Sequence, residues 1–89
     1  MTDWWFDGRL VLRDGGGDVD LVIDIDAERI SLRQGDRKLG EFPRFEVDFR
    51  WMEKDRIWLS FAGEIADFYP ARSEEFVAAL RKTRPSRRG

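Results

Sequence analysis

Apolar side chains recur at every second position through most of this chain. The clearest case is Leu21, Ile23 and Ile25, which alternate with Asp20 and Asp24 on the opposite side. Because successive side chains of a strand point to opposite faces, a period of two predicts strands with one buried face. Seven strands are predicted in this way, at residues 4–13, 19–26, 29–34, 37–42, 45–52, 57–62 and 65–70.

One helix is predicted after the last strand, over residues 73–83. Ser73 is expected to cap it, because a serine hydroxyl can accept a hydrogen bond from a first-turn amide. Phe76 and Leu80 belong to one apolar stripe, and Pro85 would stop any extension. The helix is therefore expected to cover one end of the strand assembly.

The predicted turns set the pairing of the middle strands. A tight two-residue hairpin led by Gly35 pairs Leu32 with Leu39, because glycine permits a positive φ. Pro43 cannot donate to a ladder, so we expect it at a corner where the chain crosses to a second sheet. Phe42 breaks the alternation and has no place without a bulge.

The last three strands are predicted to share one buried face. Trp51, Phe49 and Val47 are expected to face Ile57, Leu59 and Phe61, which in turn face Pro70, Phe68 and Ala66; Phe45 continues the inward row. This register places Arg50 opposite Trp58, and Trp58 opposite Tyr69, on the outer face.

The closing hairpin at residues 56–64, followed by the polar cap and helix start at residues 68–76, resembles the pleckstrin-homology-like (PH-like) superfamily. The resemblance implies a seven-stranded, partly open barrel of two near-orthogonal antiparallel sheets, capped by a C-terminal helix. It covers most of the chain through weak motifs, and the chain is short for the family. An SH3-like or lipocalin-like barrel is the alternative. We expect one domain over residues 1–80, extended by the helix 73–83.

The resemblance implies protein–protein interaction more than lipid binding. Phosphoinositide-binding members carry several basic residues around the first hairpin loop. The matching loop, residues 13–18, holds Arg13 with the acidic Asp14 and Asp18. The acidic loop argues against phosphoinositide recognition.

The composition excludes several kinds of chemistry. The chain has 89 residues, no cysteine and no histidine, so thiolate nucleophiles, disulfides and imidazole bases are absent from the sequence. No signal-peptide pattern opens the chain, and we expect a cytoplasmic protein. Thirteen arginines against three lysines are typical of a high-GC, bacterial genome. We expect no cofactor and no enzymatic activity.

The charge is unevenly distributed. Residues 81–89 carry five basic side chains, and without them 11 basic residues face 18 acidic ones, a net charge of −7 for residues 1–80. An acidic body is a poor platform for nucleic acid or anionic lipid. Residues 84–89 are expected to be a disordered basic tail that could attach weakly to either. The basic residues in question are Arg81, Lys82, Arg84, Arg87 and Arg88.

Two groups of polar residues are candidate sites of chemistry. Asp24 and Asp26 share a strand face and could hold a divalent ion only weakly, so a solvated face is the preferred interpretation. The predicted register also aligns Asp48, Ser60 and Asp67 in an outward row. No base is available there to activate the serine, so neither a metal site nor a catalytic site is predicted.

The outward row of Arg50, Trp58 and Tyr69, with Met52 nearby, is the candidate binding face. Its structural interpretation is a cross-strand ladder of cation–π and aromatic pairs. Its functional interpretation is a recognition patch for a protein partner, which includes a second copy of this chain, because these residue types are enriched at interface cores. A ligand-filled barrel ranks last, since the interior is expected to be filled by side chains.

Overall fold

We describe the protein from a computed structural model, which covers residues 4–13, 15–61 and 63–83. Seven strands, one short 3₁₀ helix and one α-helix follow each other in the predicted order. The bounds are β1 Trp4–Leu12, β2 Asp18–Ile25, β3 Arg29–Gln34, β4 Arg37–Pro43, η1 Arg44–Glu46, β5 Val47–Trp51, β6 Ile57–Phe61, β7 Glu64–Pro70 and α1 Ser73–Lys82.

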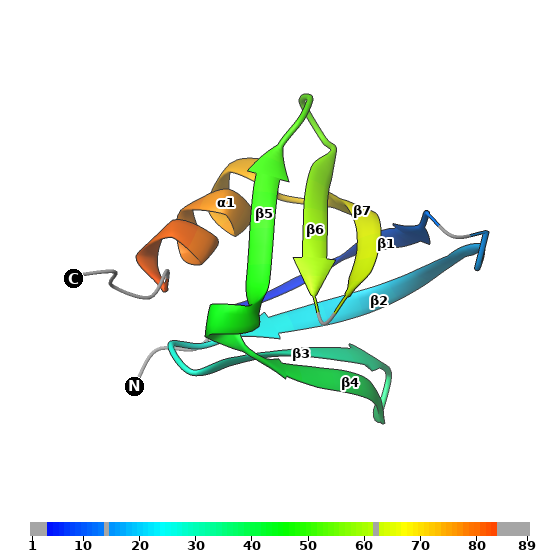
Figure 1. Ribbon diagram of the computed structural model, residues 1–89, viewed down its shortest axis with the longest axis horizontal. Coiled ribbons are helices and arrows are strands. Elements are labelled where there is room, and N and C mark those ends of the chain that lie inside the picture. Colours follow the sequence, from blue (N-terminus) through cyan, green and yellow to red (C-terminus); the bar gives the residue numbers. More distant parts are fainter. Residues whose placement is uncertain (1–3, 14, 62, 84–89) are drawn as a thin grey trace.

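All seven strands belong to one antiparallel sheet, in the order β4-β3-β2-β1-β7-β6-β5. The expected division into two sheets is not what the pairing shows, because β1 pairs with both β2 and β7. The sheet instead curls into a half-barrel, and β5 and β6 run across the direction of β2, β3 and β4 (Figure 1). The outermost strands of this sheet are β4 and β5.

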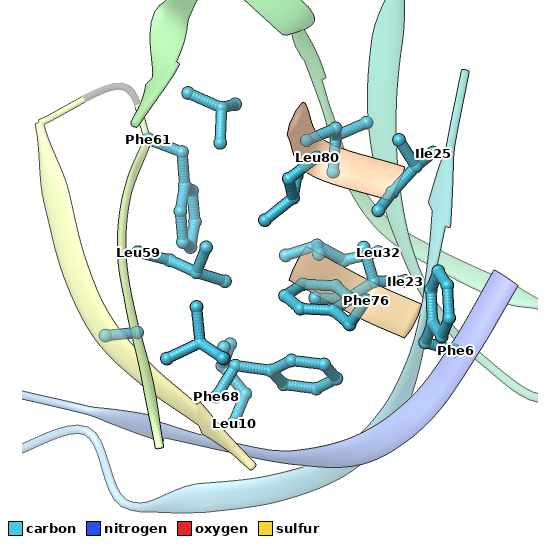
Figure 2. Close-up of a cluster of buried hydrophobic side chains, with 14 of the residues drawn as sticks. Phe6, Leu10, Ile23, Ile25, Leu32, Leu59, Phe61, Phe68, Phe76 and Leu80 are labelled. Carbon is cyan, nitrogen blue, oxygen red and sulfur yellow. The ribbon is translucent and has the colours of Figure 1, made fainter. Parts of the chain in front are cut away.

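The hydrophobic core lies inside the curl. Phe76 of α1 packs edge-on against Phe6 of β1, with ring centroids 5.3 Å apart, and against Phe68 of β7 at 4.9 Å. Figure 2 shows Phe76 and Leu80 between the side chains of β6 and those of β2 and β3. The helix therefore supplies the surface on which both arms of the sheet bury their apolar faces.

The β3–β4 hairpin explains the misfit of Phe42. Its two-residue turn is led by Gly35, at φ +63°, as predicted. A register irregularity then pairs Leu32 with Gly40, and Leu39 is left exposed, so the predicted Leu32–Leu39 pair is wrong. The extra residue reverses the faces of the rest of β4. Phe42 thereby turns inward, where its ring lies 4.9 Å from that of Phe61.

The chain turns from β4 into β5 through η1, at the corner predicted for Pro43. Phe45 lies in this 3₁₀ turn and is 71% exposed, and Trp51 at the other end of the predicted inward row is 37% exposed, so the inward assignment is wrong for both. Arg44 takes the buried position instead, at 2% exposure. Its guanidinium donates to the Val47 carbonyl at 2.8 Å, the Leu80 carbonyl at 2.7 Å and the Thr83 hydroxyl at 2.9 Å.

The α-helix occupies the expected place but begins differently. Its N-cap residue is Arg72, and no side chain caps the first turn, so Ser73 does not have the capping role expected of it. Ser73 is the first helical residue, and Arg72 supplies the carbonyl that accepts the Phe76 amide at 2.9 Å. At the start of β1, Trp4 packs against the core while Trp5 is 56% exposed.

Candidate functional site: the outer face of β5, β6 and β7

The predicted pair of Arg50 and Trp58 is present on the outer face of the sheet. The β5–β6 register is confirmed, with Phe49 opposite Leu59 and Arg50 opposite Trp58. The Arg50 guanidinium carbon lies 5.9 Å from the centroid of the Trp58 ring, a cation–π distance. Arg50 is exposed and Trp58 is half-buried.

The third member of the predicted row is not where the sequence placed it. Phe61 pairs with Glu64 around Gly63, which has φ +85°, so the turn is tighter than expected. Every partner on β7 is shifted by two residues, and Trp58 lies opposite Asp67 rather than Tyr69. A shift of two keeps each side chain on its predicted face, because the period of a strand is two.

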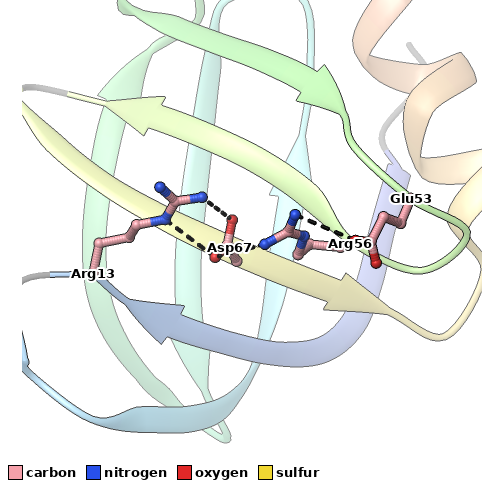
Figure 3. A network of polar contacts seen from close by, with 4 residues as sticks. All are labelled: Arg13, Glu53, Arg56 and Asp67. Atoms are coloured by element: carbon pink, nitrogen blue, oxygen red, sulfur yellow. Dashed lines mark hydrogen bonds and ion pairs between the residues drawn. The ribbon is translucent and has the colours of Figure 1, made fainter.

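Asp67 occupies the centre of this face and is 8% exposed. The Arg13 guanidinium donates two hydrogen bonds to it, Nε to Oδ2 and Nη2 to Oδ1, both at 3.2 Å. Figure 3 shows this fork from the end of β1 onto β7. The hydrogen bond and the negative charge of Asp67 raise the pKa of Arg13 above its ordinary value. The fork fastens the two strands that join the arms of the sheet.

A second arginine continues the network toward the β5–β6 turn. Arg56 Nη1 lies 3.9 Å from Asp67 Oδ2, and Arg56 Nη2 lies 3.4 Å from Glu53 Oε2. Charges therefore alternate in the order Arg13, Asp67, Arg56, Glu53 (Figure 3). Among the described residues, Arg56 Nε is the buried side-chain nitrogen or oxygen that has no hydrogen-bond partner.

Tyr69 lies farther along the outer face, beside β1. Its partner in the register is Arg9, and Tyr69 is 38% exposed. It lines an open depression of about 810 Å³ together with Asp18 and Asp20. Arg9 reaches both aspartates, at 3.7 Å and 3.5 Å. The structure therefore separates Tyr69 from the Arg50–Trp58 pair and places it in a more acidic neighbourhood.

Two further apolar residues belong to the same side of the sheet. Met52 follows β5 and is 42% exposed, and its amide donates to the Arg56 carbonyl at 2.9 Å. Ile65 is 41% exposed and pairs with Ser60, in the place that the predicted register gave to Asp67. We define the outer patch as Arg13, Arg50, Met52, Trp58, Ile65 and Asp67.

The structure does not assemble the polar row that was considered as a site of chemistry. The predicted row of Asp48, Ser60 and Asp67 is wrong, because Ser60 lies between Asp48 and Ile65. The Asp67 carboxylate already accepts both hydrogen bonds of the Arg13 fork. The face presents one indole, two exposed apolar side chains and guanidinium donors, and Trp, Met and Arg are enriched at protein–protein interfaces.

The sequence missed the role of Arg13, which it assigned only to a loop, and the central position of Asp67. The length of the turn at Gly63 could have indicated the position of Asp67, because a two-residue turn places Asp67 opposite Trp58. The approach of Arg13 depends on the pairing of β1 with β7, which sets Val11 opposite Asp67 and which no local pattern indicated.

The candidate metal ligands are engaged by the chain itself. Asp24 accepts a hydrogen bond from Arg33 Nε at 2.7 Å. Asp26 Oδ1 accepts the backbone amides of Glu28 and Arg29, at 2.7 Å and 2.8 Å, and so shapes the β2–β3 turn. Within residues 4–13, 15–61 and 63–83, no group of three acidic side chains is arranged to hold a metal ion.

The basic residues near the C-terminus fall into two sets. Arg81 and Lys82 lie exposed in the last turn of α1, where positive charge favours the helix dipole. Arg84, Arg87 and Arg88 lie outside the described residues.

No helix in the described part of the chain has the length and apolar character needed to cross a membrane. Comparisons of the chain with protein-family models, with curated proteins and with solved structures gave no significant match.

Proposed function

We propose that this chain is a non-enzymatic interaction domain that binds a protein partner through the outer patch. The observation that carries the proposal is the Arg50–Trp58 pair, held on a rigid sheet and bordered by exposed Met52 and Ile65. Tryptophan, arginine and methionine are enriched at interface cores, and contiguous apolar groups on a monomer often mark a binding surface. The partner is a protein, which includes a second copy of this chain.

The network of Arg13, Asp67 and Arg56 supports this function by holding the surface in one shape. The end of β1, strand β7 and the β5–β6 turn are joined through one nearly buried carboxylate. A surface that is already ordered loses little conformational entropy when a partner binds. Less of the favourable free energy of contacts with Trp58 would then be offset by the entropic cost of ordering the sheet.

We also propose that the fold is PH-like, with the two arms of the curled sheet corresponding to the two near-orthogonal sheets of that superfamily. The antiparallel strand order and the helix packed in the curl support this assignment. The first-hairpin arginine, Arg13, is committed to Asp67, which supports the expectation that the domain does not recognise phosphoinositides.

The test is an affinity purification from the native host with three baits: the wild-type chain, Trp58→Ala and Trp5→Ala. Trp5 is the matched control, because it is a more exposed tryptophan distant from the patch. We expect a partner that binds the wild type and Trp5→Ala but is lost with Trp58→Ala. Circular dichroism must show that all three baits are folded.

Sedimentation of the same three proteins tests association between copies of this chain. If every interaction survives in folded Trp58→Ala, Arg50→Gln should be examined next. If both variants retain all partners, the Arg50–Trp58 pair stabilises the sheet and does not bind a partner.

Attachment of the basic tail to anionic membrane or nucleic acid is the alternative. Its test requires a deletion that spares the helix, because the Thr83 hydroxyl accepts a hydrogen bond from buried Arg44. Residues 84–89 should therefore be removed and residues 81–83 kept. Unchanged binding of the shortened chain to anionic liposomes and to oligonucleotides at low salt would exclude this function.

A further inference from the structure

A second cavity lies on the other side of the molecule, between the start of β1 and the exposed face of α1. Its volume is about 390 Å³. Small-molecule sites usually enclose about 300–1,000 Å³, so the groove has the size of a site for one ring system. None of its lining residues belongs to the outer patch.

The floor of the groove includes a strand edge that no other strand covers. β7 pairs with β1 only from Gly8 onward, and the Asp7 carbonyl accepts the Ala71 amide at 3.0 Å, so among the described strands none pairs with residues 4–6 on that side. The Trp5 carbonyl faces the groove, where Arg72 Nη2 donates to it at 3.0 Å. The amide and carbonyl of one strand residue point to the same side, so the Trp5 amide is directed there as well.

Aromatic side chains form the walls. Trp4 and Trp5 are neighbours in β1, so their side chains lie on opposite sides of the strand, and both residues line the groove. The Arg72 guanidinium lies 5.9 Å from the Trp5 ring centroid and 5.0 Å from that of Phe6. On the helix, Ala78 and Ala79 provide the opposing surface, and their small side chains leave room for a flat ring.

The charges that line the groove favour an anion. Two cations, Arg72 and Lys82, face one acidic residue, Glu75. Glu75 Oε1 lies 3.6 Å from Arg72 Nε, so the charges of these two residues cancel. The ammonium of Lys82 is then the net positive charge among the lining residues. The Trp5 amide adds a neutral hydrogen-bond donor. We infer that this groove binds a small planar aromatic carboxylate, with its ring between the start of β1 and Ala78 and its carboxylate toward Lys82 and the Trp5 amide.

The probe is 2-naphthoate, added to ¹⁵N-labelled full-length chain. The four tryptophans give four indole N–H signals, which Trp5→Phe and Trp58→Phe variants help to assign. We expect saturable shifts of the Trp4 and Trp5 signals, while those of Trp51 and Trp58 stay in place. Absence of shifts, or shifts centred on Trp58, would overturn the inference.

The uncharged analogue 2-naphthylmethanol tests the role of the carboxylate. An exposed ion pair contributes up to about 1 kcal/mol, which corresponds to about a fivefold change in affinity. We expect 2-naphthoate to bind up to about fivefold more tightly at low salt, and Lys82→Gln to remove most of this preference. Equal affinities for the two probes in the wild-type chain would refute the anion preference.

Filling the groove supplies the steric test. Ala78 is exposed, so Ala78→Phe should leave the fold intact and place a ring where the ligand would lie. The matched control is Ala27→Phe, a change at an exposed alanine in the β2–β3 turn. We expect 2-naphthoate binding to be lost in the first variant and kept in the second. Equal binding by both variants would contradict the assigned site, and this outcome does not depend on the outer patch.

Discussion

Gly8 lies where β1, β7 and the core ring of Phe68 approach each other most closely. A Cβ atom built on Gly8 would lie 2.5 Å from the Tyr69 carbonyl oxygen and 2.8 Å from both Phe68 Cζ and Pro70 Cα. Real side chains do not tolerate such distances, and two of these atoms belong to backbone that is held in the sheet. A strand requires glycine at a position where another backbone approaches this closely.

Gly8→Ala is therefore expected to lower the free energy of unfolding by about 1–3 kcal/mol, because the sheet must shift to admit the methyl group. Urea unfolding followed by tryptophan fluorescence measures the change. Gly40→Ala is the matched control, since its Cβ would meet only the Phe42 ring, at 3.2 Å and 3.3 Å. An unchanged midpoint for Gly8→Ala would show that β1 and β7 are less closely packed than described.

At the scale of elements, the β3–β4 hairpin depends on one carboxylate of its edge strand. Glu41 accepts hydrogen bonds from Lys38 in β4 and from Arg29 in β3. These two cations lower the pKa of Glu41 below its ordinary value of 4.5, with the Lys38 hydrogen bond as the largest cause. Lys38 and the irregularity beside Leu39 also make β4 a poor edge for pairing with another chain.

The lowered pKa of Glu41 makes the stability of the folded protein depend on pH. Stabilisation by Glu41 is complete above pH 4.5 and is lost as the pH falls through the lower pKa of the folded state. The unfolding midpoint of Glu41→Gln should therefore lie below that of the wild type near pH 6, and the difference should shrink toward pH 3. Glu64→Gln, at a glutamate with no ion pair among the described residues, is the control. A difference that stays constant with pH would contradict the role of these ion pairs.

At the scale of the whole molecule, Arg44 holds the β4–β5 corner of the sheet against the end of α1. It lies at the junction of β4 and β5, and it donates to Leu80 and Thr83 at the end of α1. Carbonyls at a helix C-terminus lack partners within the helix and carry negative partial charge, so a guanidinium is favourable there. One buried side chain thereby connects the corner of the sheet to the last turn of the helix.

Arg44→Met should destabilise the whole domain by about 2–4 kcal/mol, because it removes the three hydrogen bonds that this buried guanidinium donates. Chemical unfolding should show a lower midpoint with an unchanged slope. The matched control is Arg81→Met, a change at an exposed arginine of the same helix end, with an expected effect within about 0.5 kcal/mol. Equal effects of the two substitutions would mean that burial of Arg44 contributes nothing.

The sequence alone determined which side of most strands is buried. Alternation placed Leu21, Ile23 and Ile25 inside, and the confirmed β5–β6 register placed Arg50 against Trp58 on the outside. A conformational requirement for glycine identified the turn at Gly35. These features are local, so neighbouring residues contain the information that specifies them.

Tertiary structure decided the strand register and the curvature of the sheet, which the alternation of apolar residues does not determine. A strand shifted by two residues keeps its buried face, so only the turn at Gly63 and the packing of β7 placed Asp67, and not Tyr69, beside Trp58. The irregularity that exposes Leu39 and the single curled sheet depend on contacts between distant segments. A period-two pattern defines the faces of a strand, whereas register and curvature depend on which partner the strand meets.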